Sequence, residues 1–365
     1  MNQQTYRKLI SGQSTGWFAA SSRSALGVAG AVYTIGIRLR NLLYCKGWLK
    51  AHRVNAAVIS VGNITTGGTG KTPLVIWLYN LLRQKNYGCA ILTRGYKATQ
   101  NSKPKTQNYF DEPAILAKTC PKAKVIVNPD RVASAAAAVN KFGANVLIMD
   151  DGFQHRRLSR DLDIVTIDAM CPFGYGKLLP AGLLREPATA LKRADAVVIT
   201  RCDQTTAAEL AQLEEKLQLI NPDIPIARSI HAPVCAKSRE HKELSTEELR
   251  DKKIFAFCGI GNPDAFLGAI ENLRLKMTGS KVYNDHHHYT DNDIADIYEK
   301  AGYLGADLIL TTQKDWSKIC GSNFSILNSQ GVPFAYLVIR LKFISGEDKI
   351  TQLIEDTLAG KITKK

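Results

Sequence analysis

A glycine-rich turn at residues 65–72, TTGGTGKT, contains the residue types that bind nucleotide phosphates. Glycines let backbone N–H groups turn inward around an anion, at the positive end of the helix that follows. Lys71 is placed to reach the β and γ phosphates, and the Thr72 hydroxyl to bind Mg²⁺. An ordinary glycine-rich loop before a helix is the alternative. The predicted nucleotide-binding residues are Thr65, Thr66, Gly67, Gly68, Thr69, Gly70, Lys71 and Thr72.

The flanking sequence predicts a strand before this turn and a helix after it. Residues 58–61 form a short run that is rich in β-branched side chains, whereas apolar residues recur at helical spacing over residues 72–83. Pro73 stands in the first helical turn, where proline is tolerated. Strand, turn and helix in this order are typical of a P-loop, although Thr65 occupies the first glycine position of the pattern G-x-x-x-x-G-K-[ST].

A pair of carboxylates, Asp150 and Asp151, ends the buried-strand pattern at residues 145–149. Open α/β sheets bind ligands at the carboxyl ends of their strands, so both side chains are expected near the phosphates. P-loop enzymes hold Mg²⁺ with a carboxylate at such a place. The two acids could instead belong to a solvated turn or a helix cap, but their position after an apolar run favours a metal site.

Strand and helix patterns alternate around these residues. Strands are predicted at residues 89–93, 124–127, 145–149, 163–167 and 196–200, and helices at 131–142 and 207–217. This alternation predicts an α/β fold with a P-loop NTPase-like, doubly wound, mainly parallel sheet. A polar stretch at residues 238–253 separates a second set of such patterns. We therefore expect an N-terminal segment at 1–50, a P-loop domain at 51–230 and a second, smaller α/β domain at 231–365, whose last strand and helix could return to the first.

Length and composition agree with a globular protein of about two domains. The chain has 365 residues, of which 45% are hydrophobic and 22% charged. Its eight cysteines are scattered and include no C-x-x-C pair. Such cysteines are typical of thiols in a reducing compartment and argue against disulfides or a zinc site.

The positive charge is confined to one part of the chain. The net charge is +15, yet no Asp or Glu occurs before Asp111, and the first 110 residues contain 15 Lys and Arg. The remaining 33 basic residues equal the 33 acidic ones, so the whole excess belongs to the N-terminal third. Such a block favours an anionic partner, either nucleic acid or an anionic membrane surface.

Residues 24–37, SALGVAGAVYTIGI, form an uncharged stretch between Arg23 and Arg38. Fourteen residues are too few to span a bilayer, which takes about 20. Basic residues continue past the stretch, unlike a cleaved signal peptide. Apolar residues among basic and aromatic ones are typical of a helix that lies on an anionic membrane surface, and a core helix that covers the sheet is the alternative.

Several short polar clusters lie at the ends of predicted elements. They contain Arg94 and Tyr96 in LTRGYKA, Asp111 and Glu112 in YFDEP, Arg131 in NPDR, and Arg185 and Glu186 in LLREP. Each alone has a routine explanation, such as a helix start at Asp111 or a surface ion pair between Arg185 and Glu186. The adjacent residues His286, His287 and His288 could be read as a metal site, but neighbouring side chains in an extended segment point to opposite sides.

Taken together, the motifs resemble one family. GNITTGGTGKTP, RGY, DEP, PDR, DDGFQH, LLPAGLLREP, DHH and TQKD occur in this order from residue 62 to residue 315. With them the chain is similar to the tetraacyldisaccharide 4'-kinases, the lipid A 4'-kinases, over nearly its whole length. The resemblance implies transfer of the ATP γ-phosphoryl group, with Mg²⁺, to the 4'-hydroxyl of the lipid disaccharide 1-phosphate precursor of lipid A. It also implies a peripheral protein at the cytoplasmic face of the inner membrane.

The resemblance implies a role for each matching residue. It assigns catalysis to Lys71 and to Asp111 with His286, the pair thought to activate the sugar hydroxyl. An Asp that holds a His imidazole would orient it to take the proton as the P–O bond forms. The implied metal ligands are Thr72, Asp150 and Asp151. The implied substrate-binding residues are Tyr96, Glu112, Arg131, Gln154, His155, Arg185 and Glu186.

Two other classes of protein remain as alternatives. A regulatory P-loop ATPase of the deviant-Walker type is suggested by TGGTGKT, but those proteins carry a lysine where Thr66 stands. A nucleic-acid-dependent ATPase would explain the basic N-terminal third, and its binding would weaken steeply with salt. The kinase interpretation expects no nucleic acid and no obligate protein partner, only the lipid disaccharide and an anionic membrane surface.

Overall fold

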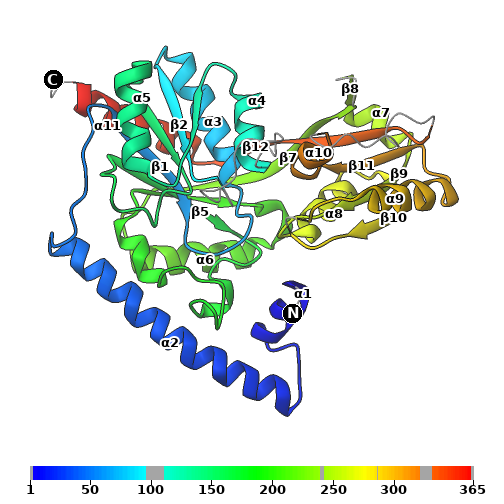
Figure 1. The fold of residues 1–365 in the computed structure, drawn as a ribbon, viewed down its shortest axis with the longest axis horizontal. Helices are drawn as coiled ribbons and strands as arrows, with labels where there is room; N and C mark the ends of the chain where they lie inside the picture. The colour runs from blue at the N-terminus through cyan, green and yellow to red at the C-terminus, as the bar shows by residue number, and fades with distance from the viewer. Residues whose placement is uncertain (1–2, 96–110, 239–241, 286, 321–330, 363–365) are drawn as a thin grey trace. The chain divides into compact units, whose positions relative to one another are not determined.

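The fold is that of a computed structural model, which describes residues 3–95, 111–238, 242–285, 287–320 and 331–362 (Figure 1). The chain forms two compact units. The first comprises Met1–Arg94, Cys120–Ile230 and Lys342–Lys365, and the second Gly95–Thr119 and His231–Leu341. The predicted phosphate loop and the Asp150–Asp151 pair both belong to the first unit.

The first unit is built on a parallel sheet. Its strands are β1 (Ala57–Asn63), β2 (Cys89–Thr93), β3 (Lys124–Val127), β4 (Val146–Asp150), β5 (Leu162–Asp168), β6 (Ala196–Thr200) and the beginning of β7 (Ile226–Ser238). They lie in the order β7-β6-β5-β1-β4-β2-β3, and every neighbouring pair is parallel. The chain builds the sheet on one side of β1 first and then crosses to β5 on the other. The carboxyl ends at such a reversal are where α/β sheets bind ligands.

Helices flank this sheet because their apolar faces match its buried strands. They are α3 (Lys71–Gln84), α5 (Arg131–Phe142), α6 (Ala207–Ile220) and α11 (Glu347–Ile362). Helix α3 packs on β1 and β4, and α5 on β2 and β3. Ala135 and Ala138 of α5 enter a core with Leu147. The leucines of α6, Leu210 and Leu213 among them, enter a second core with strands β5 and β6. This packing leaves the carboxyl ends of the strands to the connecting loops.

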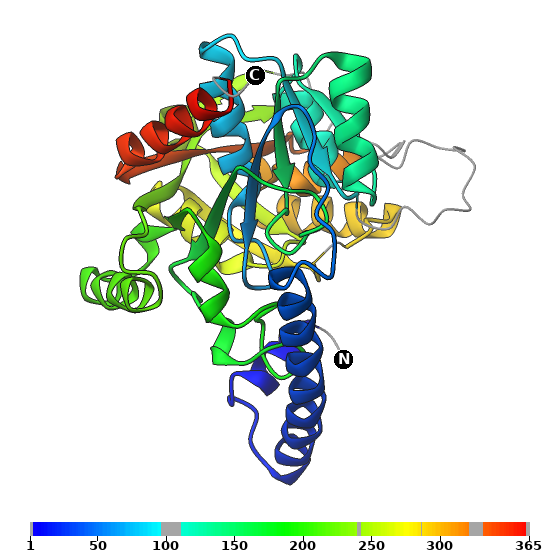
Figure 2. The same ribbon diagram turned by 90° about the vertical axis from the view of Figure 1, so that its left-hand side faces the viewer.

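Two N-terminal helices complete the first unit, α1 (Gln3–Ile10) and α2 (Trp17–Cys45). Figures 1 and 2 both show α2 as one long helix, in dark blue, that projects beyond the sheet. Helix α2 is longer than the uncharged stretch at residues 24–37. It begins before this stretch, at Trp17, and continues past it through Arg38 and Arg40. Within the described ranges, no helix is both long enough and apolar enough to cross a membrane.

The second unit has its own strands and helices. The strands are β8 (Glu243–Ser245), β9 (Lys253–Cys258), β10 (Lys276–Val282), β11 (Leu308–Thr312) and β12 (Phe334–Ser345) as far as Leu341. The helices are α4 (Asp111–Thr119), α7 (Thr246–Arg250), α8 (Pro263–Asn272), α9 (Asp291–Tyr303) and α10 (Gln313–Cys320). Strands β10, β9, β11 and β12 lie in this order and pair in parallel, whereas β8 pairs antiparallel with β7. Phe257, Tyr289 and Phe334 pack together in its core.

Candidate active site

The loop between β1 and α3 has the backbone of an anion-binding turn. Gly67 and Gly70 have φ angles of 116° and 83°, in the region that favours glycine. Gly70 precedes the first turn of α3, and among the described residues no side chain caps its amides. These amides point out of the positive end of the helix, so they are available to phosphate oxygens.

Side chains from neighbouring strands hold the back of this loop. Thr69 is 3% exposed, and its hydroxyl lies 3.0 Å from the amide nitrogen of Asn63, which donates to it, and 2.8 Å from the Thr166 hydroxyl. The Thr200 hydroxyl donates to the Thr69 carbonyl at 3.0 Å. The loop is therefore positioned before any ligand arrives, which reduces the ordering cost of binding.

Arg201 holds the loop from the end of β6. Its guanidinium is buried, pairs with the carboxylate of Asp168 at the end of β5, and donates to the carbonyl of Gly68. Sequence reasoning missed this group and the threonines behind Thr69. The available signal was a polar residue directly after each buried strand pattern, TID at residues 166–168 and ITR at 199–201.

We expect Arg201→Met to lower the free energy of unfolding by about 3–5 kcal/mol, because Asp168 would remain buried without its cation. The double variant with Asp168→Leu should recover much of that stability. In both variants the KM for ATP should be about tenfold higher than in the native protein, because the Gly68 carbonyl has lost its hydrogen-bond donor. Urea unfolding and ATP titrations on both variants check this, and a native KM in the double variant would reject the role of Arg201.

Lys71, Asp151 and Arg185 form a charged junction beside the loop. The Asp151 carboxylate lies 3.3 Å from Lys71 Nζ, and Arg185 Nη1 donates to both of its oxygens at 2.9 Å. Burial alone would raise the pKa of Asp151, but Lys71 and Arg185 together lower it well below its usual range. Asp151 is thus an ionised carboxylate that fixes two cations next to the phosphate loop.

Asp150 ends β4 and Arg131 begins α5, and both are buried. The Asp150 carboxylate accepts a hydrogen bond of 3.2 Å from the Thr93 hydroxyl. Arg131 donates to the carbonyls of Asn128 at 2.8 Å and Asp150 at 3.1 Å, and burial lowers its pKa to about 10. The structure therefore gives Arg131, a predicted substrate ligand, main-chain partners within its own unit.

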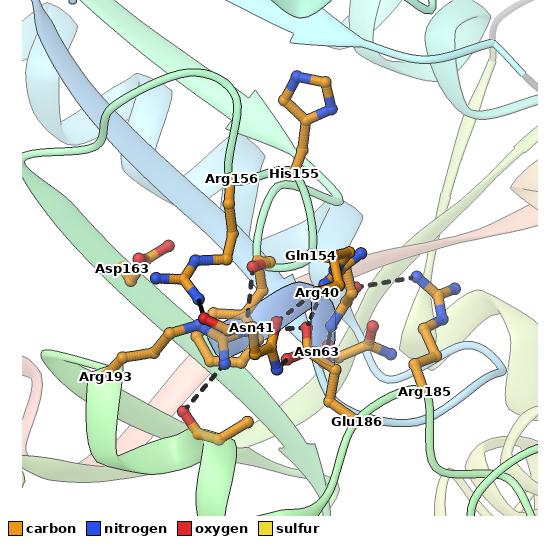
Figure 3. Close-up of polar contacts among 12 residues, drawn as sticks. Arg40, Asn41, Asn63, Gln154, His155, Arg156, Asp163, Arg185, Glu186 and Arg193 are labelled. Atoms are coloured by element: carbon orange, nitrogen blue, oxygen red, sulfur yellow. Dashed lines mark hydrogen bonds and ion pairs between the residues drawn. The ribbon is translucent and has the colours of Figure 1, made fainter. Parts of the chain in front are cut away.

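Gln154 and His155 follow the acidic pair. Gln154 donates to the Asn63 carbonyl at 2.8 Å and accepts from Arg185 at 3.4 Å, so it lies beside the charged junction (Figure 3). Figure 3 shows His155 pointing away from Gln154. Burial lowers the pKa of His155 to about 4, and the positive charge of nearby Arg131 is the second cause. The ring is therefore neutral at pH 7. Its Nε2 is buried and has no hydrogen-bond partner among the described residues.

Glu186 is fully buried among cationic and amide side chains. It accepts hydrogen bonds from Arg193 at 2.8 Å, from Asn41 at 2.9 Å and from Arg40 at 3.4 Å (Figure 3). Two of these donors come from α2, more than 140 residues earlier in the chain. Glu186 was predicted to bind substrate beside Arg185, whereas in this structure its carboxylate is enclosed by protein donors.

Two predicted site residues, Tyr96 and His286, lie outside the described residues. Asp111 and Glu112 form the first turn of α4, and their side chains are not among those described. The neighbouring His287 lies 3.1 Å from the Asp293 carboxylate, in the second unit.

Thr72, Asp150 and Asp151 have the donor chemistry that Mg²⁺ prefers. Thr72 lies in the first turn of α3, and Asp150 is opposite Val61 of the adjacent strand β1. Mg²⁺ takes oxygen ligands and is usually held by one or two protein groups together with substrate phosphates and water. Among the described residues there is no cluster of three or more His, Cys, Asp or Glu that could hold a metal. The residues present therefore fit an ion that takes its other ligands from a nucleotide.

Comparison with known proteins identifies the family. A sequence profile of the family described as LpxK, Tetraacyldisaccharide-1-P 4'-kinase, matches residues 22–359. The chain belongs to this family. The tetraacyldisaccharide 4'-kinase of Syntrophus aciditrophicus is 37% identical over 328 residues, which cover 85% of this chain and 86% of that protein. The enzyme of the same description from Anaeromyxobacter sp. Fw109-5 is 34% identical over 343 residues, 91% of each chain.

A solved structure of the LpxK family has the same fold. The crystal structure of the "apo" form of LpxK from Aquifex aeolicus in complex with ATP matches with a TM-score of 0.70 and 31% sequence identity. The match covers 92% of this chain and 99% of that chain. The predicted family and the predicted P-loop NTPase-like α/β fold are therefore confirmed. The roles of individual residues stay predictions.

Proposed function

We propose that this chain transfers the γ-phosphoryl group of ATP to the 4'-hydroxyl of the tetraacyldisaccharide 1-phosphate precursor of lipid A. The observation that carries the proposal is the junction of Lys71, Asp151 and Arg185 beside a phosphate loop whose back is already held in place. Membership of the 4'-kinase family supplies the acceptor, which the geometry alone does not name.

The charges at the junction suit phosphoryl transfer. Negative charge spreads over the γ-phosphoryl oxygens as the bond to the leaving oxygen breaks, so catalysis consists mostly of positioning and neutralisation. Lys71 and Arg185 supply two cations, and Asp151 keeps both at the loop before ATP arrives. Mg²⁺, when held by Thr72 with Asp150 or Asp151, would neutralise further phosphate charge.

The acceptor hydroxyl needs a base, since an alcohol is a poor nucleophile near neutral pH. We assign this role to His286, oriented by Asp111. Tyr96, Glu112, Gln154, His155 and Arg185 are proposed to contact the disaccharide headgroup. Arg131 and Glu186, which have buried partners in this structure, are better assigned to support of the site.

The membrane surface is the proposed partner of α2. Large apolar side chains recur on one exposed face of the helix, at Val28, Val32, Ile35, Leu39 and Leu42, each at least half exposed. Trp17 and Phe18 begin the same helix and are about 70% exposed. An apolar stripe in the basic N-terminal third suits an anionic leaflet. Family membership, not the stripe, supports the further proposal of a peripheral location at the cytoplasmic face of the inner membrane.

We expect the protein to copurify with membranes and to be released by salt plus detergent, but by neither alone, because charge and apolar burial each contribute.

The double variant Val32→Asp with Ile35→Asp should bind anionic vesicles at least about tenfold more weakly, because burial of each native side chain contributes roughly 1.5–3 kcal/mol. Leu219→Asp, an exposed apolar position on α6, is the matched control and should bind as the native protein does. Recovery of the native protein in the soluble fraction at low salt would contradict the membrane proposal.

One assay separates the proposed function from its alternatives. Purified protein receives ATP and Mg²⁺ with lipid disaccharide 1-phosphate, with DNA or RNA, or alone. A kinase should form ADP only with the lipid and should transfer the phosphate to it. Turnover that depends on nucleic acid, or that needs no acceptor, would instead support one of the two ATPase alternatives.

A further inference from the structure

Helix α2 has two faces. One is the exposed apolar stripe, and the other, which we call the inner face, packs against the rest of the first unit. Gly30 is buried there, and a Cβ added to it would lie 3.0 Å from Ala181 Cβ. The Tyr33 hydroxyl donates to the Arg185 carbonyl at 3.0 Å. From α1, the Tyr6 hydroxyl donates to the Pro180 carbonyl at 2.8 Å. All three contacts fall on residues 178–186, which we call the linking segment.

Glu186 makes the strongest contact between α2 and the linking segment. Its carboxylate is 0% exposed and accepts from Arg40 and Asn41 of α2 and from Arg193 (Figure 3). Hydrogen bonds to a buried charge are stronger than those between neutral groups, and a broken one leaves a charge without its partner. Glu186 therefore fixes the carboxyl-terminal half of α2 to the linking segment.

The other side of the linking segment contacts the phosphate loop. The Thr66 amide donates to the Leu183 carbonyl at 2.8 Å, and the Arg185 amide donates to the Ile64 carbonyl at 2.8 Å. Thr65 and Leu184 form an antiparallel bridge between the same two stretches. The Arg185 side chain then reaches Asp151, the partner of Lys71. A single stretch of nine residues thus lies between α2 and the phosphate loop.

We infer that α2 supports the ATP site through the linking segment, and that Glu186 is a positioning residue for the phosphate loop and Arg185. Displacement of the inner face of α2 would shift the carbonyls that hold Thr66 and the backbone that carries Arg185. The helix would then have two separable functions: its outer face binds the membrane, and its inner face keeps the nucleotide site ordered. This inference rests on the proposed function in taking ATP as the nucleotide.

The test measures the dissociation constant for ATP by titration calorimetry, with the full chain in detergent micelles and without acceptor. Asn41→Ala removes one α2 donor and leaves Arg193 on Glu186, so the carboxylate keeps a cation. Gly30→Leu pushes the inner face away from Ala181. Each should weaken ATP binding by about 3- to 30-fold. Ala31→Ser, at an exposed position of the same helix outside the apolar stripe, should bind ATP within about twofold of the native protein.

Titrations are done well below the unfolding temperature of each variant, so a loss of folded protein does not contribute. A merely structural contact would lower that temperature and leave the ATP dissociation constant of the folded protein unchanged, which would overturn the inference. Adding Asn41→Ala to Glu186→Gln should weaken ATP binding little beyond the single change, because both act through one contact.

A direct acceptor-binding role for Glu186 gives a different result. Glu186→Gln would then raise the KM for the lipid and leave ATP affinity unchanged, and that outcome would also overturn the inference. The two proposals can fail separately. A native protein that binds ATP but phosphorylates no lipid disaccharide would reject the proposed function, while the ATP titrations of the α2 variants would still decide the coupling.

Discussion

Lys71→Ala is expected to lower kcat by about 10³-fold or more while the protein stays folded. The lysine is the cation placed to meet charge that develops on the transferred phosphoryl group, and such preorganised donors give the largest single contributions to catalysis. The fold should survive because Asp151 keeps Arg185, which donates to both of its oxygens at 2.9 Å. The measurement is kcat at saturating ATP and lipid, with thermal unfolding of the same preparation.

Thr72 provides a matched pair of variants for the same assignment. Thr72→Ala removes the hydroxyl proposed to bind Mg²⁺ and should also lower kcat severely, whereas Thr72→Ser keeps that hydroxyl and should retain most of the activity. Near-native turnover in either Lys71→Ala or Thr72→Ala would reject the P-loop assignment. Equal losses in the alanine and serine variants would reject the metal role of the hydroxyl.

Asp111 and His286 are expected to act as one unit. If Asp111 orients the imidazole that takes the hydroxyl proton, Asp111→Asn or His286→Ala should each lower kcat by about 10²- to 10⁴-fold. Removing both should cost little more than removing one. A double-mutant cycle on kcat measures this directly, and His288→Ala, at an exposed neighbouring histidine, is the control with near-native turnover.

The alternative for this pair is a helix-terminus acid and an unrelated histidine. Asp111 begins α4, where an acid favours the helix through its N-terminal amides. In that case Asp111→Asn would lower stability by about 0.5–2 kcal/mol and leave kcat of the folded protein nearly native. Additive losses in log kcat would reject the coupled pair, even if each single variant were slow.

The sequence alone predicts the strands of the first unit well. The predicted bounds of β2, β3 and β6 agree with the structure. Strands β2 and β6 are short apolar runs buried in the parallel sheet, whereas β3 is a partly exposed edge strand that its β-branched residues still mark. Strand β7 (Ile226–Ser238) was missed. Its burial alternates irregularly and it includes Pro233, so no simple period marks it.

The N-terminal helix shows why element ends are harder to predict. The uncharged stretch at residues 24–37 marks only the middle of α2, which runs on to Cys45. Its carboxyl-terminal half contains Arg40 and Asn41. From the local pattern alone, these polar residues would be expected to end the helix or to lie exposed on its surface. Their partner, Glu186, lies about 145 residues further along the chain. Such a contact is tertiary, and no local pattern carries it.

The same reasoning applies to the site. Lys71, Thr72, Asp150 and Asp151 could be singled out from the sequence because each follows a strand or turn pattern in a fixed local order, and their roles stay predictions. The position of Arg201 directly after a strand pattern was a usable signal, but its pairing with Asp168 and Gly68 was not predictable, because they meet only once three strands lie side by side. The proximity of Arg185 to Asp151 likewise depends on the bridge between Thr65 and Leu184.

The most direct measurement of the central claim is ³¹P NMR of a reaction that contains purified protein, ATP, Mg²⁺ and lipid disaccharide 1-phosphate in micelles. The proposed function predicts one new phosphomonoester on the lipid, at the 4' position, for each ADP formed. It also predicts no such signal with the Lys71→Ala variant. ADP that accumulates with inorganic phosphate, while the lipid keeps only its 1-phosphate, would contradict the account.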